Sequence, residues 1–312
     1  MIIGVMTVNG IDFHPNKRLI EAAHSGHRIL LVNPYDIICT MDMKKSGGTY
    51  FSGFPFSGFP MDASGDASGL IPDVILPRQG SPMGEYGFVL LRHFVKMKIP
   101  LVNGIEGVTI AKNQYMTLQA LGSAGIAVPD SCFITRKTSF FKAVEHLGGF
   151  PVIAKQVDGM GGDGVVKIET RTQAQGYLDT QLNPLKGMLV QKFLDPSGRQ
   201  DVRMLMIGGR LAGAMALKPS PGDFRANIHQ NGQAIPIDPP GEWVEIALNA
   251  AKACCLEIAG VDMIIEKGGN PLVVEVNYSP GFRGLEAATG RDIARQILDY
   301  VTSIIPIKND KK

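Results

Sequence analysis

Short apolar runs alternate with amphipathic segments over the first third of the chain. Between residues 15 and 24, Leu19, Ile20 and Ala23 fall on one face, which is the spacing of a helix that packs on a sheet. Strands that alternate with helices in this way are typical of a small, mostly parallel sheet. The pattern predicts strands at 2–8, 28–33, 74–77 and 100–103, and helices at 15–24 and 86–97.

The pattern changes after residue 108, where strands and helices fall into two further groups. The first group reads as a small α+β domain, and the second contains two hairpins and two long helices. We therefore predict three units, covering residues 1–108, 109–187 and 188–312. The predicted helices are 110–121, 139–147, 243–258 and 291–304, and the predicted strands are 132–135, 151–155, 188–194, 201–207 and 210–218.

A β-hairpin with a four-residue turn, Lys267–Asn270, is predicted near the C-terminus. If the two residues that flank the turn face each other, antiparallel register places Asp262 directly opposite Glu275. Asn277 lies two residues further along, on the same face of the hairpin. The other face is entirely apolar and consists of Val261, Met263, Ile265, Leu272, Val274 and Val276.

Two opposed carboxylates with Cβ atoms about 5 Å apart repel each other unless a positive charge lies between them. A hard cation such as Mg²⁺ binds carboxylate and carbonyl oxygens, and it usually keeps substrate phosphates as further ligands. The hairpin therefore predicts either a metal site at Asp262, Glu275 and Asn277 or an acidic strand end that is exposed to water.

The composition is that of an ordinary globular protein, with 45% hydrophobic and 19% charged residues among 312. A net charge of +2 without a basic stripe argues against binding to nucleic acid. No apolar run approaches the roughly 20 residues that span a bilayer, and the apolar N-terminus lacks a basic leader. Four scattered cysteines without a Cys-x-x-Cys pair argue against disulfides and zinc. We expect a cytoplasmic protein that binds neither nucleic acid nor membrane.

Residues 42–69 form a tandem low-complexity stretch, in which Ser-Gly-Phe-Pro and Asp-Ala-Ser-Gly each occur twice. Such a stretch can bury little apolar surface, so we expect a mobile excursion from the fold. Its phenylalanines could line a surface for a partner. A solvent-exposed loop with a local aromatic cluster explains them equally well.

A glycine-rich segment, residues 158–164, follows the predicted strand that ends at Lys155. Its glycine spacing matches a dinucleotide-binding motif, but a strand-like sequence follows where that motif requires a helix. The segment is therefore either a flap that closes over phosphates or a simple turn. Lys155 is a candidate phosphate ligand beneath such a flap, although a lysine at a strand edge is common. Arg203, Arg225 and His229 are further potential anion ligands.

These features together indicate a nucleoside triphosphate bound with Mg²⁺. Family motifs are found at 190–193, 201–203, 222–229, 259–262, 274–281 and 289–294, and they include Arg-x-Asn-x-His and Glu-x-Asn-x-Ser-Pro-Gly. Through these motifs the chain resembles the ATP-grasp ligases, and within them the RimK-type glutamate ligases, over nearly its whole length. The resemblance implies an α/β and α+β architecture, with an N-terminal Rossmann-like parallel-sheet domain followed by two α+β subdomains that clasp ATP.

The resemblance also implies a role for each matching residue. Lys112 and Lys155 would contact the phosphates, Lys192 and Phe193 the adenine through the hinge backbone, and Asp201 the ribose. The complete set of expected ATP contacts is Lys112, Lys155, Gly161, Gly162, Gln191, Lys192, Phe193, Asp201, Arg225, Asn227 and Ile264. The expected catalytic residues are Lys155, Arg203, Arg225 and Asn227. The expected ligands of Mg²⁺ or Mn²⁺, as two ions, are Asp262, Glu275 and Asn277. Ile264 and Val273 would form part of the floor beneath the nucleotide.

The implied reaction joins a carboxylate to an amine through an acylphosphate, with glutamate as the first candidate amino acid and a protein or small molecule as acceptor. A ligase that makes a dipeptide or glutathione-like metabolite and a non-catalytic nucleotide-binding regulator are the alternatives. The resemblance also suggests a homo-oligomer. Three departures from the family pattern leave the amino acid and acceptor open: Lys192 in the hinge, the weakly charged segment 216–221, and Phe282-Arg283 after the last motif glycine.

Overall fold

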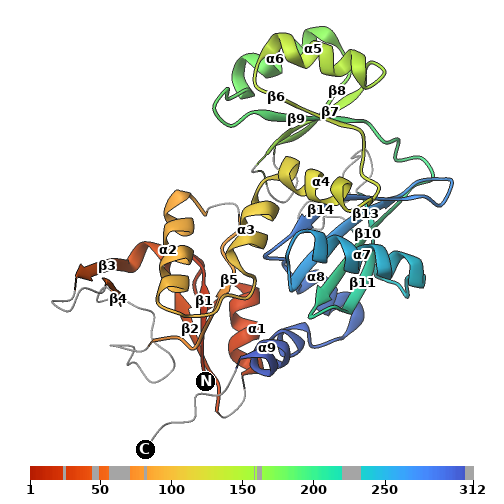
Figure 1. The fold of residues 1–312 in the computed structure, drawn as a ribbon. Coiled ribbons are helices and arrows are strands. Elements are labelled where there is room, and N and C mark those ends of the chain that lie inside the picture. Colours follow the sequence, from red (N-terminus) through yellow and green to blue (C-terminus); the bar gives the residue numbers. More distant parts are fainter. Residues whose placement is uncertain are drawn as a thin grey trace, which may run out of the picture.

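The computed structural model describes residues 1–23, 26–43, 49–55, 71–80, 83–157, 159, 164–219 and 233–305. Within these residues, three sheets of three, four and five strands form three lobes, and a two-stranded hairpin projects from the first lobe (Figure 1).

The N-terminal lobe is built on a parallel sheet with strand order β2-β1-β5. Apart from Arg28 at the start of β2, its strands contain no polar side chain, as expected for a sheet that is covered by helices on both faces. The side chains of Ile3 and Val5 are fully buried on one face, and those of Met6 and Ile75 on the other. The elements are β1 (Ile2–Met6), α1 (His14–Ala22), β2 (Arg28–Val32), η1 (Pro34–Asp36), β5 (Val74–Pro77), α2 (Glu85–Lys96) and α3 (Ile105–Lys112). This is the predicted small parallel sheet.

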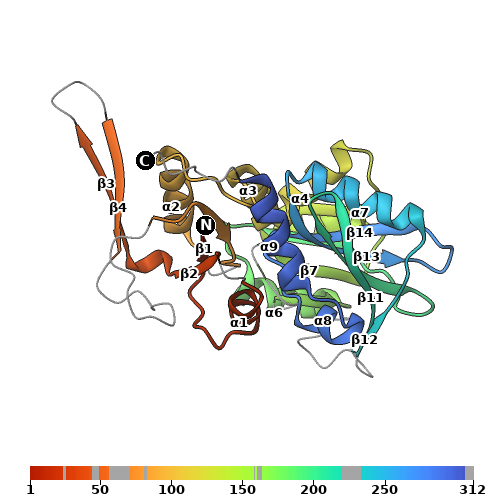
Figure 2. The same ribbon diagram turned by 90° about the horizontal axis from the view of Figure 1, so that it is seen from below.

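The hairpin of β3 (Ile37–Met43) and β4 (Thr49–Pro55) extends away from the rest of the fold (Figure 2). Within the excursion predicted at residues 42–69, the segment 49–55 forms a strand that the sequence analysis did not predict, and its mobility stays a prediction. This segment is rich in Tyr, Phe and Thr, which favour strands, and it pairs with β3 in antiparallel register. The remainder of the excursion, residues 44–48 and 56–69, lies outside the described residues.

The central lobe is an antiparallel sheet with strand order β6-β9-β7-β8, and it carries two helices on one face (Figure 1). Its elements are β6 (Ser131–Ile134), α5 (Lys137–His146), β7 (Val152–Gln156), β8 (Val165–Ile168), α6 (Arg171–Gln181) and β9 (Met188–Lys192). Because β9 pairs with both β6 and β7, a boundary after residue 187 would cut through this sheet. We propose to place the boundary between the second and third units after Lys192.

The single helix expected at 110–121 is two helices, α3 and α4 (Gln114–Ser123). Asn113 separates them because its side-chain oxygen accepts hydrogen bonds from the backbone N–H groups of Tyr115 and Met116, which begins a new helix. The break places Lys112 at the end of α3, immediately before the turn into α4.

The C-terminal lobe is an antiparallel sheet with strand order β12-β11-β10-β13-β14. The strands predicted at 201–207 and 210–218 are joined by a two-residue turn, Gly208-Gly209. Ile207 faces Arg210 across this turn, and both glycines have positive φ angles. Helices α4 and α7 pack on one face of the sheet, and α9 lies beside α1 of the N-terminal lobe (Figure 1). The elements are β10 (Gln200–Ile207), β11 (Arg210–Lys218), β12 (Gln233–Pro236), α7 (Gly241–Ala253), β13 (Ile258–Ile265), β14 (Pro271–Asn277), α8 (Arg283–Thr289) and α9 (Ile293–Ile304).

The β13–β14 hairpin has the predicted pairing at its far end but not at its turn. Asp262 faces Glu275 as expected, whereas Pro271 faces Ile265 instead of Glu266. A β-bulge between Asp262 and Met263 absorbs the one-residue difference.

The bulge exchanges the faces of two valines. Val273, expected on the floor of the nucleotide site, is fully buried in the core with Met263 and Val276, while Val274 lines the pocket described below. The prediction for Val273 was wrong because an extra residue in one strand reverses the alternation of faces beyond it.

Candidate active site

Three charged side chains lie in a row across three neighbouring strands of the C-terminal sheet. Asp262 on β13 faces Arg203 on β10 on one side and Glu275 on β14 on the other. Strand pairing therefore brings together one predicted catalytic residue and two of the three predicted metal ligands. Asn277 follows two residues after Glu275, on the same strand.

Arg203 and Asp262 form a two-pronged ion pair. The Arg203 Nε donates to Asp262 Oδ1 at 2.6 Å, and its Nη2 donates to Oδ2 at 2.5 Å. The two side chains are only 19% and 14% exposed. Burial lowers the pKa of the Arg203 guanidinium, but the Asp262 carboxylate outweighs burial and holds this pKa above its ordinary value. The arginine is therefore locked in its charged form against the carboxylate.

Glu275 is less well neutralised than Asp262. Burial raises the pKa of its carboxyl group, the neighbouring Asp262 charge raises it further, and Arg203, Lys155 and the Asn277 side chain oppose the rise. The net shift is upward, so the folded chain disfavours the ionised form of Glu275. A buried carboxylate in this condition gains from any additional cation.

Lys155 approaches this row from the central lobe, where it lies near the end of β7 and faces Val165 of β8. Burial lowers the pKa of its amine, while the charges of Glu275 and Asp262 oppose this effect. The structure thus brings the predicted phosphate lysine to the predicted metal carboxylates. As predicted, the glycine-rich segment after Lys155 connects two antiparallel strands.

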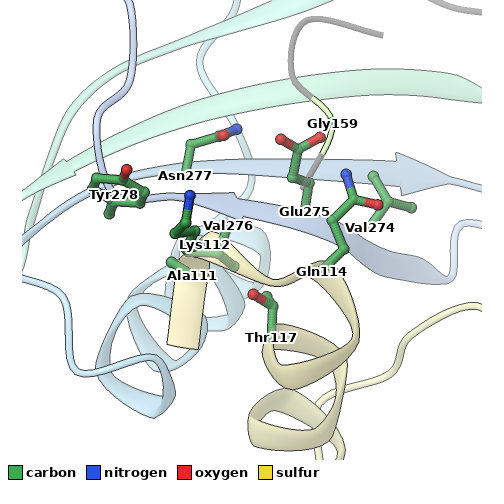
Figure 3. Close-up of a pocket in the computed structure, with 10 residues that line it drawn as sticks. All are labelled: Ala111, Lys112, Gln114, Thr117, Gly159, Val274, Glu275, Val276, Asn277 and Tyr278. Carbon is green, nitrogen blue, oxygen red and sulfur yellow. The ribbon is translucent and has the colours of Figure 1, made fainter. Parts of the chain in front are cut away.

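A pocket lies beside this cluster, between β14 and the two helices α3 and α4 (Figure 3). Figure 3 shows the side chains of Lys112 and Gln114 turned towards Glu275 and Asn277. The Lys112 amine donates a hydrogen bond to the backbone oxygen of Met83 and lies 5.8 Å from the centre of the Phe88 ring. The pocket is lined by Ala111, Lys112, Gln114, Thr117, Gly159, Val274, Glu275, Val276, Asn277 and Tyr278.

Gln114 is a pocket residue that the sequence did not reveal. Its side-chain oxygen is buried without a hydrogen-bond partner, and its backbone N–H donates to the Val157 oxygen at 3.0 Å. An unpaired buried amide oxygen that faces a pocket is a ready acceptor for a ligand. The only sequence signal was its place after the helix cap Asn113.

The predicted hinge contacts are partly used by the protein itself. The Gln191 side chain is buried and donates to the Ser131 hydroxyl at 3.0 Å. The Lys192 backbone N–H donates to the Asp130 oxygen at 3.0 Å, so this amide is not available to adenine. The Phe193 ring lies 4.6 Å from the amine of Lys167, a cation–π contact that fixes the first residue after β9.

Asp201 is held by an arginine that the sequence did not single out. The Arg199 Nε lies 2.8 Å from one Asp201 oxygen, and its Nη2 donates to the other at 3.1 Å. Burial raises the pKa of the Asp201 carboxyl more than Arg199 lowers it. Asp201 on β10 faces Ile264 on the neighbouring strand β13, so these two expected ATP contacts lie side by side.

Four predicted site residues fall outside the described residues. Gly161 and Gly162 belong to the glycine-rich segment, and Arg225 and Asn227 belong to residues 220–232. His229 lies in the same stretch. Their roles remain predictions from the sequence.

Comparisons with known proteins agree with this arrangement. The model of the RimK-like ATP-grasp domain matches residues 111–301. The probable alpha-L-glutamate ligase of Aliivibrio salmonicida is 32% identical over 312 residues, covering 100% of this chain and 98% of that protein. Among solved structures, the RimK domain protein ATP-grasp from Sphaerobacter thermophilus superposes with a TM-score of 0.69 at 21% identity, covering 97% of this chain and 100% of that chain.

A second solved structure, the ATP-grasp ligase PsnB complexed with minimal precursor, Mg and ADP, superposes with a TM-score of 0.66 at 18% identity, covering 97% of this chain and 96% of that chain. The fold and the site thus define an ATP-grasp ligase. Within that class, the chain belongs to the RimK-like ATP-grasp family. No helix among the described residues is long and apolar enough to cross a membrane.

Proposed function

We propose that this enzyme uses ATP to join a carboxylate to the amine of an amino acid, forming an amide and releasing ADP and phosphate. The observation that carries the proposal is the half-buried cluster of Lys155, Arg203, Asp262 and Glu275 beside a pocket. Two cations and two carboxylates gathered in one partly shielded place suit a site that binds a triphosphate and its metal ions.

The donor set at this cluster fits Mg²⁺ or Mn²⁺. Asp262 and Glu275 would supply carboxylate oxygens and Asn277 an amide oxygen, the ligand types that these ions prefer. Among the residues that the structure describes, no group of three His, Cys, Asp or Glu side chains could hold a metal, so the Asn277 oxygen would be needed as the third donor. The raised pKa of Glu275 also fits, because a nearby cation would favour its ionised form.

The protein side chains would do the binding and alignment. Lys155, and Lys112 at the end of α3, would neutralise phosphate oxygens from opposite sides of the cluster. Arg203, Arg225 and Asn227 would face the anionic reaction centre. The ions, two in our proposal, would supply charge neutralisation at the triphosphate, as the Mg and ADP in the PsnB complex suggest.

The chemistry would proceed in two steps on the substrates. A carboxylate oxygen attacks the γ-phosphorus and ADP leaves, which gives an acylphosphate. The amine then attacks the acyl carbon, and phosphate leaves with the former carboxylate oxygen. Both transition states are anionic, and this explains the gathering of cationic side chains at one place.

Glutamate is our first candidate for the amino acid, because curated relatives at about 31–32% identity are named probable alpha-L-glutamate ligases. The acceptor would be a peptide, a protein or a small molecule. A further structure of PsnB, complexed with precursor peptide PsnA2 and AMPPNP, supports a peptide as the first choice.

ADP release measured across the amino acids and a panel of peptide and small-molecule acceptors, with mass spectrometry of the products, tests the proposal. Lys155→Ala and Glu275→Ala should each lower the rate by about 10²–10³, typical of removing an electrostatic group from such a site. ADP release that never depends on an amine, or near-normal turnover in both variants, would contradict the proposal.

A further inference from the structure

A buried guanidinium without a counter-charge lies at the carboxyl end of β5. Arg78 is only 8% exposed. Its Nη2 donates to the backbone oxygen of Pro280 at 2.6 Å, whereas its Nε and Nη1 are buried without an acceptor. Among the described residues, no carboxylate forms an ion pair with it.

Such an arrangement is unfavourable for the protein without a bound anion. A buried cation normally has a carboxylate or several hydrogen-bond acceptors, and an unpaired one is strongly unfavourable. The Phe282 ring, whose centre is 5.6 Å from the guanidinium carbon, provides part of the compensation. Burial lowers the pKa of Arg78 to about 10, and Tyr278 opposes this shift. Among the described residues, the guanidinium therefore has no anion beside it.

Arg78 lies where substrate is expected in a parallel sheet. Ligands of open α/β sheets bind beyond the carboxyl ends of the strands, and Arg78 follows β5 directly. The neighbouring residues connect this edge to the proposed metal strand, since the Tyr278 hydroxyl donates to the Gln79 oxygen at 2.5 Å. Tyr278 follows Asn277 in the chain and lines the pocket of Figure 3. This hydrogen bond thus links the residue after Arg78 to the residue after the proposed metal ligand Asn277.

A second unsatisfied group marks the same sheet edge. Asn16, at the start of α1, is 1% exposed, and its side-chain oxygen has no donor. Its nitrogen donates to the backbone oxygens of Asn9 and Gly10, both at 2.9 Å, and so holds the loop after β1. That loop is tied to the Arg78 strand end, because the Val8 N–H donates to the Gln79 side chain at 2.6 Å. The unpaired Nε and Nη1 donors of Arg78 and the unpaired acceptor oxygen of Asn16 suit a ligand that carries both hydrogen-bond acceptors and hydrogen-bond donors.

We propose that Arg78 binds a spectator carboxylate of the amino-acid substrate, and that it thereby determines the specificity of the enzyme for acidic amino acids. The inference rests on the proposed function, in which the amino acid reacts through its amine and keeps its carboxylates. The depth of Arg78 favours a small substrate over the tail of a protein acceptor. Phe282, a departure from the family pattern, contacts the guanidinium and also lies near the His14 ring, with 5.9 Å between the two ring centres.

The test compares glutamate, glutamine and glutamate α-amide as substrates of the wild-type enzyme and of Arg78→Gln and Arg78→Lys. In the wild type, one of the two amides should have kcat/KM about 100-fold below that of glutamate, and which amide it is identifies the carboxylate that Arg78 binds. Arg78→Gln should lower kcat/KM for glutamate about 100-fold, mainly through KM, and should leave kcat/KM for that amide unchanged. Arg78→Lys should be intermediate, because it keeps the charge but not the geometry of the donors.

Arg291→Gln is the matched control. Arg291 also donates to a backbone oxygen, that of Ala212 at 2.8 Å, but it is exposed and lies at the turn between α8 and α9. It should leave the ranking of the three substrates unchanged.

Equal use of all three substrates by the wild type would overturn the inference without any variant. An equal loss for all three substrates in Arg78→Gln, or a rise confined to the KM of the acceptor, would overturn it too. Failure of the wild type to form an amide from any amino acid would reject the proposed function and the inference with it. Product formation with unchanged selectivity in Arg78→Gln would reject the inference alone.

Discussion

Replacing Arg203 with glutamine is expected to destabilise the metal-free protein and to make its stability depend on magnesium. In the structure, Arg203 holds both oxygens of Asp262, and Glu275 lies directly beyond Asp262. Without the guanidinium, two carboxylates face each other, and of the described basic residues that compensate Glu275 only Lys155 is left. Arg203 would thus serve the metal-free protein as a stand-in for the cation that the site is built to receive.

The magnitude follows from the burial of the pair. Removing one partner of a buried ion pair costs about 3–5 kcal/mol. Because the two side chains keep 19% and 14% exposure, we expect the lower end, about 3 kcal/mol. For a chain of 312 residues this loss corresponds to a fall in melting temperature of about 5 °C. Added Mg²⁺ should restore up to about 2.7 kcal/mol at one hundred times its Kd.

Thermal and urea unfolding of the wild type, Arg203→Gln, Asp262→Asn and the double variant, with EDTA and with Mg²⁺, measure these effects. The double variant should be more stable than the sum of the single effects predicts, by about 2 kcal/mol or more. The surface pair of Arg295 and Asp299, whose side chains are 30% and 60% exposed, provides the control. Arg295→Gln should cost at most about 0.5 kcal/mol and should show no magnesium dependence.

Two results would refute this reasoning. A coupling energy near zero between Arg203 and Asp262 would mean that the pair does not stabilise the fold. Equal stabilisation of the wild type and Arg203→Gln by Mg²⁺ would mean that the arginine does not stand in for an ion.

The other predictions concern the phosphate lysine, the bulge and one packed glycine. Burial lowers the pKa of Lys155, so turnover should decline with rising pH earlier than an ordinary lysine would cause. Lys155→Arg should therefore move the alkaline limit of the kcat/KM profile to higher pH. An unmoved limit would exclude Lys155 as the group that sets it. Val273→Ala should cost about 2 kcal/mol in unfolding experiments and Val274→Ala less than about 1 kcal/mol, whereas the reverse order would contradict the bulged register. Gly107→Ala should cost about 1–3 kcal/mol, because an added Cβ would lie 2.2 Å from the Cys255 backbone oxygen; unchanged stability would mean that the contact relaxes freely.

The alternation of apolar and polar residues was sufficient to predict the parallel N-terminal sheet and the opposition of Asp262 and Glu275. It could not locate the bulge, because Leu272, Val273 and Val274 are all apolar and any of them fits either face. The turn between β13 and β14 is one residue longer than predicted. The bulge shifts the register back by one residue, so that Asp262 still faces Glu275.

Contacts between distant segments were beyond the reach of local patterns. The pairing of Arg203 with Asp262 joins residues 59 positions apart, and nothing in either strand specifies the partner. The proposed move of Met188–Lys192 to the second unit has the same origin, since a strand does not indicate from its own sequence which sheet it will join. The sequence did not single out Arg78, because burial without a counter-charge is a property of the folded state.

The isotope content of the released phosphate tests the central claim most directly. With an acceptor whose carboxylate carries ¹⁸O, the acylphosphate route transfers one labelled oxygen from the carboxylate to inorganic phosphate for each amide formed. We predict singly labelled phosphate in proportion to product. Unlabelled phosphate, or label in AMP, would contradict an acylphosphate ligase.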